Sequence, residues 1–165
     1  MLDAIKGSAP RNLLSSRIHE GSKAVGETGV TQGRRRLLMK SMEGALNWFE
    51  IPVRDLARAR QFYELIFEIR MQQVTLGTGL KMAIFPVSVG TVGGALCEHD
   101  RFYKPSHDGV LVYLNANPEL QNVLDRVEDG GGRVVIARTQ ISPEMGYMSV
   151  FEDTEGNRIA LRAMK

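Results

Sequence analysis

Residues 45–163 pass twice through one order of predicted secondary structure, and this repeat limits the possible folds more than any other feature. The first copy opens with a strand, because apolar residues alternate there with a face that carries Trp48 and Glu50. Asp55 is a preferred helix N-cap, and after it apolar residues recur every three or four positions. The first copy is therefore a strand, a helix and three strands, at residues 47–53, 56–67, 69–75, 80–87 and 92–97.

The second copy follows a polar connector at residues 98–108. Tyr113 occupies the place of Glu50, 63 residues further along the chain. Asn117 is the expected cap of the second helix, with Pro118 at its first position, where a missing amide hydrogen costs nothing. The second copy is again a strand, a helix and three strands, with the helix ending at glycines 130–132, the strands at residues 110–115, 133–138, 146–151 and 158–163, and a tight turn at 153–157.

In each copy the helix can cover only one face of its sheet, so the other face stays free. The repeat predicts an α+β fold of two βαβββ modules that pair their sheets around a shared cavity, with the helices outside. Module one spans about residues 45–98 and module two about residues 109–163. Because Trp48 and Glu50 lie on the helix-free strand face, we expect function to reside there.

Residues 1–44 are expected to form a disordered, basic extension, because they lack sustained apolar periodicity. Residues 1–40 hold eight Lys or Arg against three Asp or Glu, a balance of +5. Residues 41–165 hold thirteen against sixteen, a balance of −3. Whether the extension is a targeting segment, or whether translation begins near Met39 or Met42, stays open.

The composition restricts location and partners. Cys97 is the only cysteine, which excludes an intramolecular disulfide and favours a reducing, cytoplasmic location. On an apolar strand this thiol is expected to be buried and structural. No apolar run reaches the length that spans a bilayer, and the domain lacks a basic stripe. We therefore expect neither a membrane nor nucleic acid as a partner.

Five segments stand in an order that resembles the vicinal oxygen chelate (VOC) superfamily, which includes glyoxalase I, bleomycin-resistance proteins and extradiol dioxygenases. They are FEIPVRDLARARQFYELIF, VGGAL, VYLNA, VEDGGGRVV and FEDTEGNRIAL. The resemblance covers about residues 45–163 and implies a homodimer. It also implies a divalent metal, held by His and Glu side chains, that polarises two neighbouring oxygens of the substrate.

The metal ligands that the resemblance implies are missing from this sequence. Trp48 stands where the His of the opening strand is expected, and Ala160 stands where the Glu of the last strand is expected. The matching strand of module two, GVLVYLN, contains no His. Neither an indole nor a methyl group replaces such a ligand. We therefore expect no metal and no cofactor.

The residues that we expect to contact a small-molecule ligand are Trp48, Glu50, Tyr113 and Arg162. Trp48 would stack on a flat ligand, while Glu50 would favour a cationic or hydrogen-bond-donating group. Glu50 could equally form a structural pair with Tyr113, Arg158 or Arg162. His99 and His107 are expected to be exposed side chains of the polar connector, without a role in binding.

Three functions are compatible with this sequence. The first is a metal-free small-molecule-binding protein of the glyoxalase/bleomycin-resistance type. The second is a lyase, isomerase or dioxygenase that uses an atypical metal site or Glu50 as general base. The third is a structural or regulatory module whose cavity is filled by its own side chains.

Overall fold

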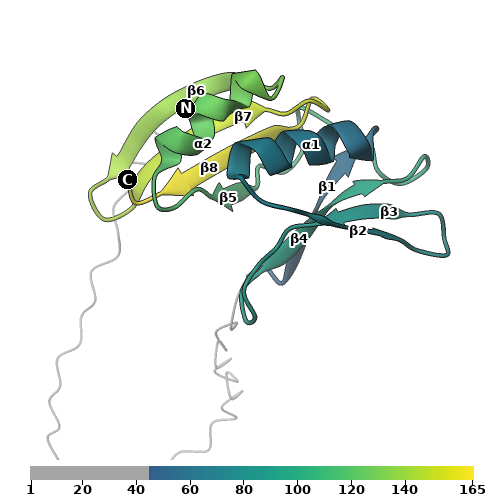
Figure 1. Cartoon of the computed structure of the whole chain (residues 1–165). Coiled ribbons are helices and arrows are strands. Elements are labelled where there is room, and N and C mark those ends of the chain that lie inside the picture. Colours follow the sequence, from purple (N-terminus) through teal and green to yellow (C-terminus); the bar gives the residue numbers. More distant parts are fainter. Residues whose placement is uncertain (1–44) are drawn as a thin grey trace, which may run out of the picture. The chain divides into compact units, whose positions relative to one another are not determined.

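A computed structural model describes residues 45–165 of the chain, and the predicted extension, residues 1–44, lies outside the described residues. These residues form two helices and eight strands, which are labelled in Figure 1. The first module contains β1 (Trp48–Val53), α1 (Leu56–Phe67), β2 (Gln72–Thr75), β3 (Lys81–Ile84) and β4 (Gly93–Glu98). The second contains β5 (Tyr113–Asn115), α2 (Leu120–Asp129), β6 (Arg133–Ser142), β7 (Gly146–Glu152) and β8 (Arg158–Ala163).

The two sheets have the same topology, which confirms the predicted α+β fold of two βαβββ modules. The strand orders are β1-β4-β3-β2 and β5-β8-β7-β6. In each sheet the first strand pairs in parallel with the last, and the other pairs are antiparallel. Strand ends differ from the prediction, since β5 is shorter and β6 runs on to Ser142 with three register irregularities.

Helix α1 begins where the sequence predicts. The Asp55 side chain accepts a hydrogen bond from the Arg58 amide at 2.9 Å, which satisfies one free donor of the first turn. The helix ends at Glu68, whose backbone adopts the left-handed conformation. The buried face is the predicted apolar stripe, made of Leu56, Ala59, Phe62, Tyr63 and Ile66.

The predicted cap of α2 is wrong. Glu119, and not Asn117, is the N-cap, and the helix begins at Leu120. The Asn117 side chain is occupied elsewhere, because its oxygen accepts the Met164 amide at 3.0 Å and its nitrogen donates to Asn115. Asn117 therefore ties the end of the chain to β5 instead of capping the helix.

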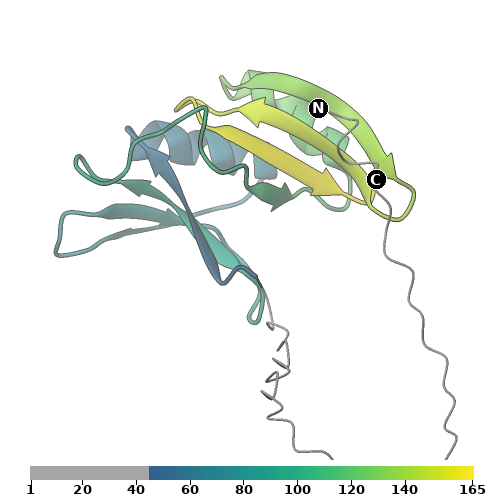
Figure 2. The same ribbon diagram turned by 180° about the vertical axis from the view of Figure 1, so that it is seen from behind.

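One hydrophobic core joins the two modules on the helix-covered sides of the sheets. Helices α1 and α2 lie side by side, and their apolar faces pack against residues of both modules, among them Ile51, Leu96, Phe151 and Leu161. The Phe62 and Phe151 rings lie 5.8 Å apart between centroids, so α1 contacts module two directly. Figure 2, seen from behind, shows the strands in front of the helices.

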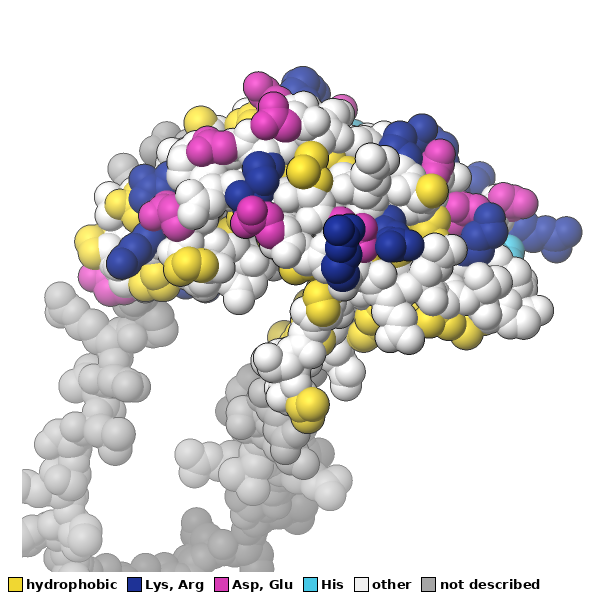
Figure 3. Space-filling view, viewed as in Figure 1, with side chains coloured by type: hydrophobic (Ala, Val, Ile, Leu, Met, Phe, Trp, Pro, Cys, Tyr) yellow, Lys and Arg dark blue, Asp and Glu magenta, His cyan; other side chains and the backbone are white. Residues whose placement is uncertain are grey.

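The surface of the helix-covered side carries charges of both signs. Figure 3 shows Lys and Arg interspersed with Asp and Glu on that face. Neither described helix is long and apolar enough to cross a membrane.

Candidate ligand-binding site

Glu50 on β1 is the centre of a hydrogen-bonded cluster on the helix-free face of the first sheet. Trp48 Nε1 donates to Glu50 Oε1 at 3.2 Å. The Tyr103 hydroxyl, from the connector between the modules, donates to Glu50 Oε2. Trp48, Glu50 and Tyr103 are named the Glu50 cluster below. Both oxygens of the carboxylate are thus held in place from two different elements.

The alternation of β1 explains why Trp48 and Glu50 share this face. Successive side chains of a strand point to opposite faces, so Ile51 and Val53 enter the core while Trp48 and Glu50 stay outside it. Trp48 keeps 42% of its surface exposed, and Glu50 is also exposed. A large indole beside an exposed carboxylate offers both apolar and polar contact to a ligand.

Cys97 on β4 lies next to the Glu50 cluster. It is free and buried, as predicted. Burial, together with the negative charge of Glu50, raises the pKa of the Cys97 thiol to about 12. The hydrogen bond to Glu50, with burial, raises the pKa of Tyr103 as well. Both groups are therefore neutral at physiological pH. The one carboxylate of the cluster is that of Glu50.

The partners predicted for Glu50 are wrong. None of Tyr113, Arg158 and Arg162 contacts it, because these residues belong to the second sheet. Tyr113 is half exposed on β5, and the exposed Arg162 donates from Nε to the Met145 carbonyl at 3.1 Å. The described chain therefore brings Trp48 and Glu50 together but leaves Tyr113 and Arg162 on a separate face.

Tyr103 is the member of the cluster that the sequence did not indicate. It lies in a connector without periodicity, so no pattern predicts which way its side chain points. The only local signal is a pair of aromatic residues, Phe102 and Tyr103, in a segment that is mostly polar. Tyr103 is positioned by its neighbours, since the Ser106 amide, three residues on, donates to Asn157 Oδ1 at 3.1 Å.

Tyr103 also lines a cleft of about 430 Å³. His99 is half-buried in it, and its Nδ1 accepts the Arg101 amide at 3.2 Å. His107 is exposed and lies 3.2 Å from Glu152. The cleft is lined by Val53, Arg54, Glu98, His99, Asp100, Tyr103, Lys104 and Pro105.

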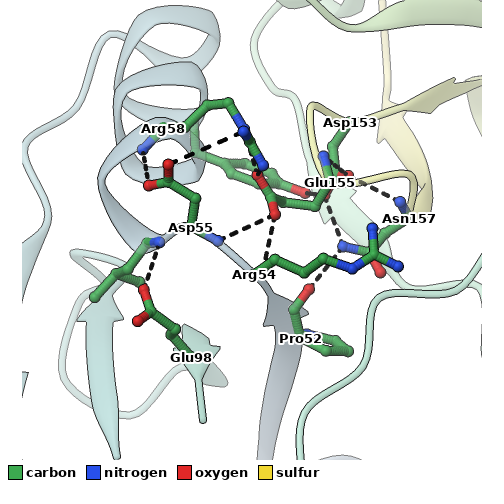
Figure 4. Close-up of polar contacts among 10 residues, drawn as sticks. Pro52, Arg54, Asp55, Arg58, Glu98, Asp153, Glu155 and Asn157 are labelled. Atoms are coloured by element: carbon green, nitrogen blue, oxygen red, sulfur yellow. Dashed lines mark hydrogen bonds and ion pairs between the residues drawn. The ribbon is translucent and has the colours of Figure 1, made fainter. Parts of the chain in front are cut away.

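The turn at residues 153–157, which carries the last motif of the resemblance, joins the two modules. Asp153 is buried. Its side-chain oxygens accept hydrogen bonds from the Tyr63 hydroxyl at 2.8 Å and from the backbone amide of Asn157 at 2.8 Å. The Asn157 side chain donates to the Pro52 carbonyl at 2.9 Å. Burial raises the pKa of Asp153, while the hydrogen bonds that it accepts oppose this rise. Figure 4 shows these contacts between the turn and module one.

Glu155 in the same turn holds the start of α1. Its side chain is fully buried and accepts the Arg54 amide at 2.8 Å and the Asp55 amide at 3.2 Å. The Arg58 guanidinium donates to the other oxygen from two nitrogens, at 2.8 and 2.7 Å. Glu98 accepts the Leu56 amide at 2.8 Å in the same region (Figure 4). These carboxylates satisfy amide donors at the positive end of the helix dipole.

The residues at the implied metal positions do not fit a metal ion. Trp48 lies at the start of β1, and Ala160 is fully buried opposite Tyr113 in β8. Within residues 45–165 no three His, Cys, Asp or Glu side chains are placed to hold a metal. An indole and a methyl group offer no lone pair to a divalent cation.

Comparison with known proteins identifies the region that shares a family pattern. The sequence model of the Glyoxalase/Bleomycin resistance protein/Dioxygenase superfamily matches residues 45–161. No curated protein matches the chain in sequence.

Solved structures with this fold include proteins whose names refer to antibiotics. TnmS3, an antibiotic binding protein from Streptomyces sp. CB03234, is 18% identical with a TM-score of 0.55, over 75% of this chain and 98% of that one. A glyoxalase/bleomycin resistance protein from the same organism is 19% identical with a TM-score of 0.54, over 72% and 99%. The fosfomycin resistance protein FosX from Listeria monocytogenes is 17% identical with a TM-score of 0.52, over 74% and 92%. At these identities the likeness establishes the fold alone.

Proposed function

We propose, from the premise that the chain belongs to the glyoxalase/bleomycin resistance protein/dioxygenase superfamily, that it binds a small molecule without a metal ion. The observation that carries this proposal is the Glu50 cluster. A carboxylate held by an indole and a phenol on an exposed sheet face is a recognition point with no structural task in the described core. One structure with the same fold, TnmS3, is named an antibiotic binding protein, which is consistent with such a role.

The binding site is completed, in this proposal, by a second copy of the chain. Trp48 and Glu50 lie on one helix-free face, whereas Tyr113 and Arg162 lie on the other. If the second sheet of one copy covers the first sheet of another, all four residues line one cavity. A twofold homodimer contains two such cavities, because each copy supplies both faces. The buried, neutral Cys97 is compatible with the cytoplasmic location that we propose.

We expect sedimentation to give twice the chain mass of 18.3 kDa. Tyr113→Ala removes a large aromatic side chain from the face that meets the partner, and we expect it to raise the dimer dissociation constant at least about tenfold, or 1.4 kcal/mol. Leu65→Ala is the matched control, because Leu65 is similarly exposed but lies on α1. A monomeric native protein, or equal weakening by both variants, would contradict the proposed dimer.

A metal analysis separates the binding protein from a metal-dependent enzyme. We expect the purified protein to contain far less than one equivalent of nickel, zinc, iron or manganese. Addition of these ions should leave the melting temperature unchanged, whereas an ion at 100 times its Kd would stabilise the protein by about 2.7 kcal/mol. One equivalent of metal that is lost in Glu50→Gln would overturn the proposed function and favour an enzyme with an atypical site.

A further inference from the structure

The charge of Glu50 has no counter-ion in the described part of the chain. None of the ion pairs within residues 45–165 involves Glu50, although nearby carboxylates such as Glu98 and Glu155 each have a cationic partner. The indole N–H and the phenol that donate to Glu50 are both neutral, and so is the Cys97 thiol beside it. A carboxylate has about four acceptor positions, more than these three groups can fill, so one is left for a ligand.

The surroundings of this charge are aromatic and apolar. Trp48 and Tyr103 bring two ring systems to the carboxylate, and Met82 and Cys97 are directly paired on the neighbouring strands β3 and β4. The Cys97 thiol is neutral and adds no charge of its own to the site. Such a surface offers an area on which an aromatic ring of a ligand can stack, together with one fixed negative charge.

We infer that the Glu50 cluster recognises a planar aromatic cation, with Tyr103 as the residue that positions the carboxylate. This inference rests on the proposed function and assigns the ligand class of the same site. A cation gains both the attraction of the carboxylate and that of the indole face, and aromatic faces attract cations specifically. In the proposed dimer Arg162 of the second copy also lines this cavity, but its Nε is bonded to the Met145 carbonyl of its own module. The cation is therefore assigned to the Trp48 and Glu50 face, where an anion would be repelled by Glu50 and a neutral ring would gain stacking alone. Tyr103 acts through Glu50, because its hydroxyl donates to one carboxylate oxygen and so fixes the position of the carboxylate.

The single tryptophan of the chain reports directly on this site. The full-length protein is titrated with N-methylnicotinamide chloride, a planar aromatic cation, with neutral nicotinamide and with anionic nicotinate. Trp48 fluorescence intensity and lifetime are both recorded, because a bound complex lowers the intensity without shortening the lifetime. We expect saturable quenching by the cation with a Kd about tenfold lower than for nicotinamide, and weaker binding of nicotinate.

Three variants test which residues cause the preference. Glu50→Gln keeps the shape and should reduce the ratio of the nicotinamide Kd to the cation Kd to about one. Tyr103→Phe keeps the ring, removes the hydroxyl and should lower the ratio about two- to threefold. Glu128→Gln removes one charge from the exposed surface of α2 and should leave the ratio unchanged. A purely structural role of Tyr103 would change the melting temperature without changing this ratio.

The possible results separate this inference from the proposed function. Cation preference that is lost in Glu50→Gln and kept in Glu128→Gln supports the inference. Saturable binding of all three probes with equal affinity, or a preference for nicotinate, overturns the inference and leaves the proposed function intact. Absence of saturable quenching by every probe also overturns the inference. The proposed function fails with it only if no member of a broad small-molecule set raises the melting temperature.

Discussion

Glu155→Ala is expected to lower the free energy of unfolding by about 3–5 kcal/mol, because it removes the buried acceptor of three hydrogen bonds and the ion pair with Arg58. The Arg54 and Asp55 amides lose their partner at the start of α1, and the link between the modules is cut. Urea unfolding followed by circular dichroism measures this loss. Glu155→Gln, which keeps one oxygen, should fall between the alanine variant and the native protein.

Asp55→Ala is the matched control for this result. The Asp55 side chain accepts one amide of the same helix and is half exposed. Unlike the Asp55 backbone amide, this side chain makes no hydrogen bond to module two. Loss of such a cap costs about 1 kcal/mol. If the two alanine variants lose equal stability, Glu155 is only another cap and does not join the modules.

Gly146→Ala is the second change with a large expected effect, about 3 kcal/mol or more. Gly146 opens β7 with φ of +74°, and a Cβ added there would lie 2.2 Å from the Ala163 carbonyl oxygen. Backbone cannot turn away as a side chain can, so β8 must shift. Since Arg162 precedes Ala163, this shift would also disturb the helix-free face of module two.

Gly156→Ala isolates the backbone part of that cost. Gly156 has φ of +87°, but no atom lies within 4 Å of the added Cβ. Only the left-handed conformation opposes the substitution, at about 1 kcal/mol. Thermal unfolding of Gly146→Ala and Gly156→Ala separates the cost of the left-handed backbone from the cost of the clash with β8. Equal losses would mean that the start of β7 moves freely away from β8.

The motif FEDTEGNRIAL shows why a family pattern predicts a fold more readily than a function. In this chain its polar residues are structural, because Asp153, Glu155 and Asn157 bond to the first module. They are buried in the fold and are not offered to a ligand. These residues therefore hold the two modules together, while the positions that would mark metal chemistry, Trp48 and Ala160, carry residues that cannot supply it.

The secondary structure could be read from residues close together in the chain. Alternation along a strand and a three- to four-residue period along a helix are local properties, so β1, α1 and the repeat followed from spacing alone. The Asp55 cap is local too, since its partner lies three residues away. The Asn117 cap failed for the opposite reason: its side chain is taken by Met164, 47 residues further along the chain.

Spacing and composition along the chain were enough to predict the two βαβββ modules, the buried thiol of Cys97 and the strand face on which Trp48 and Glu50 lie. The groups that meet Glu50 became known from the folded chain alone, because Tyr103 lies 53 residues away in a connector without periodicity. The folded chain also shows that Glu155 holds a helix start 101 residues earlier in the chain. Periodicity specifies which way a side chain points within its own element. The partner that it meets depends on how elements pack, and that packing is a property of the whole core.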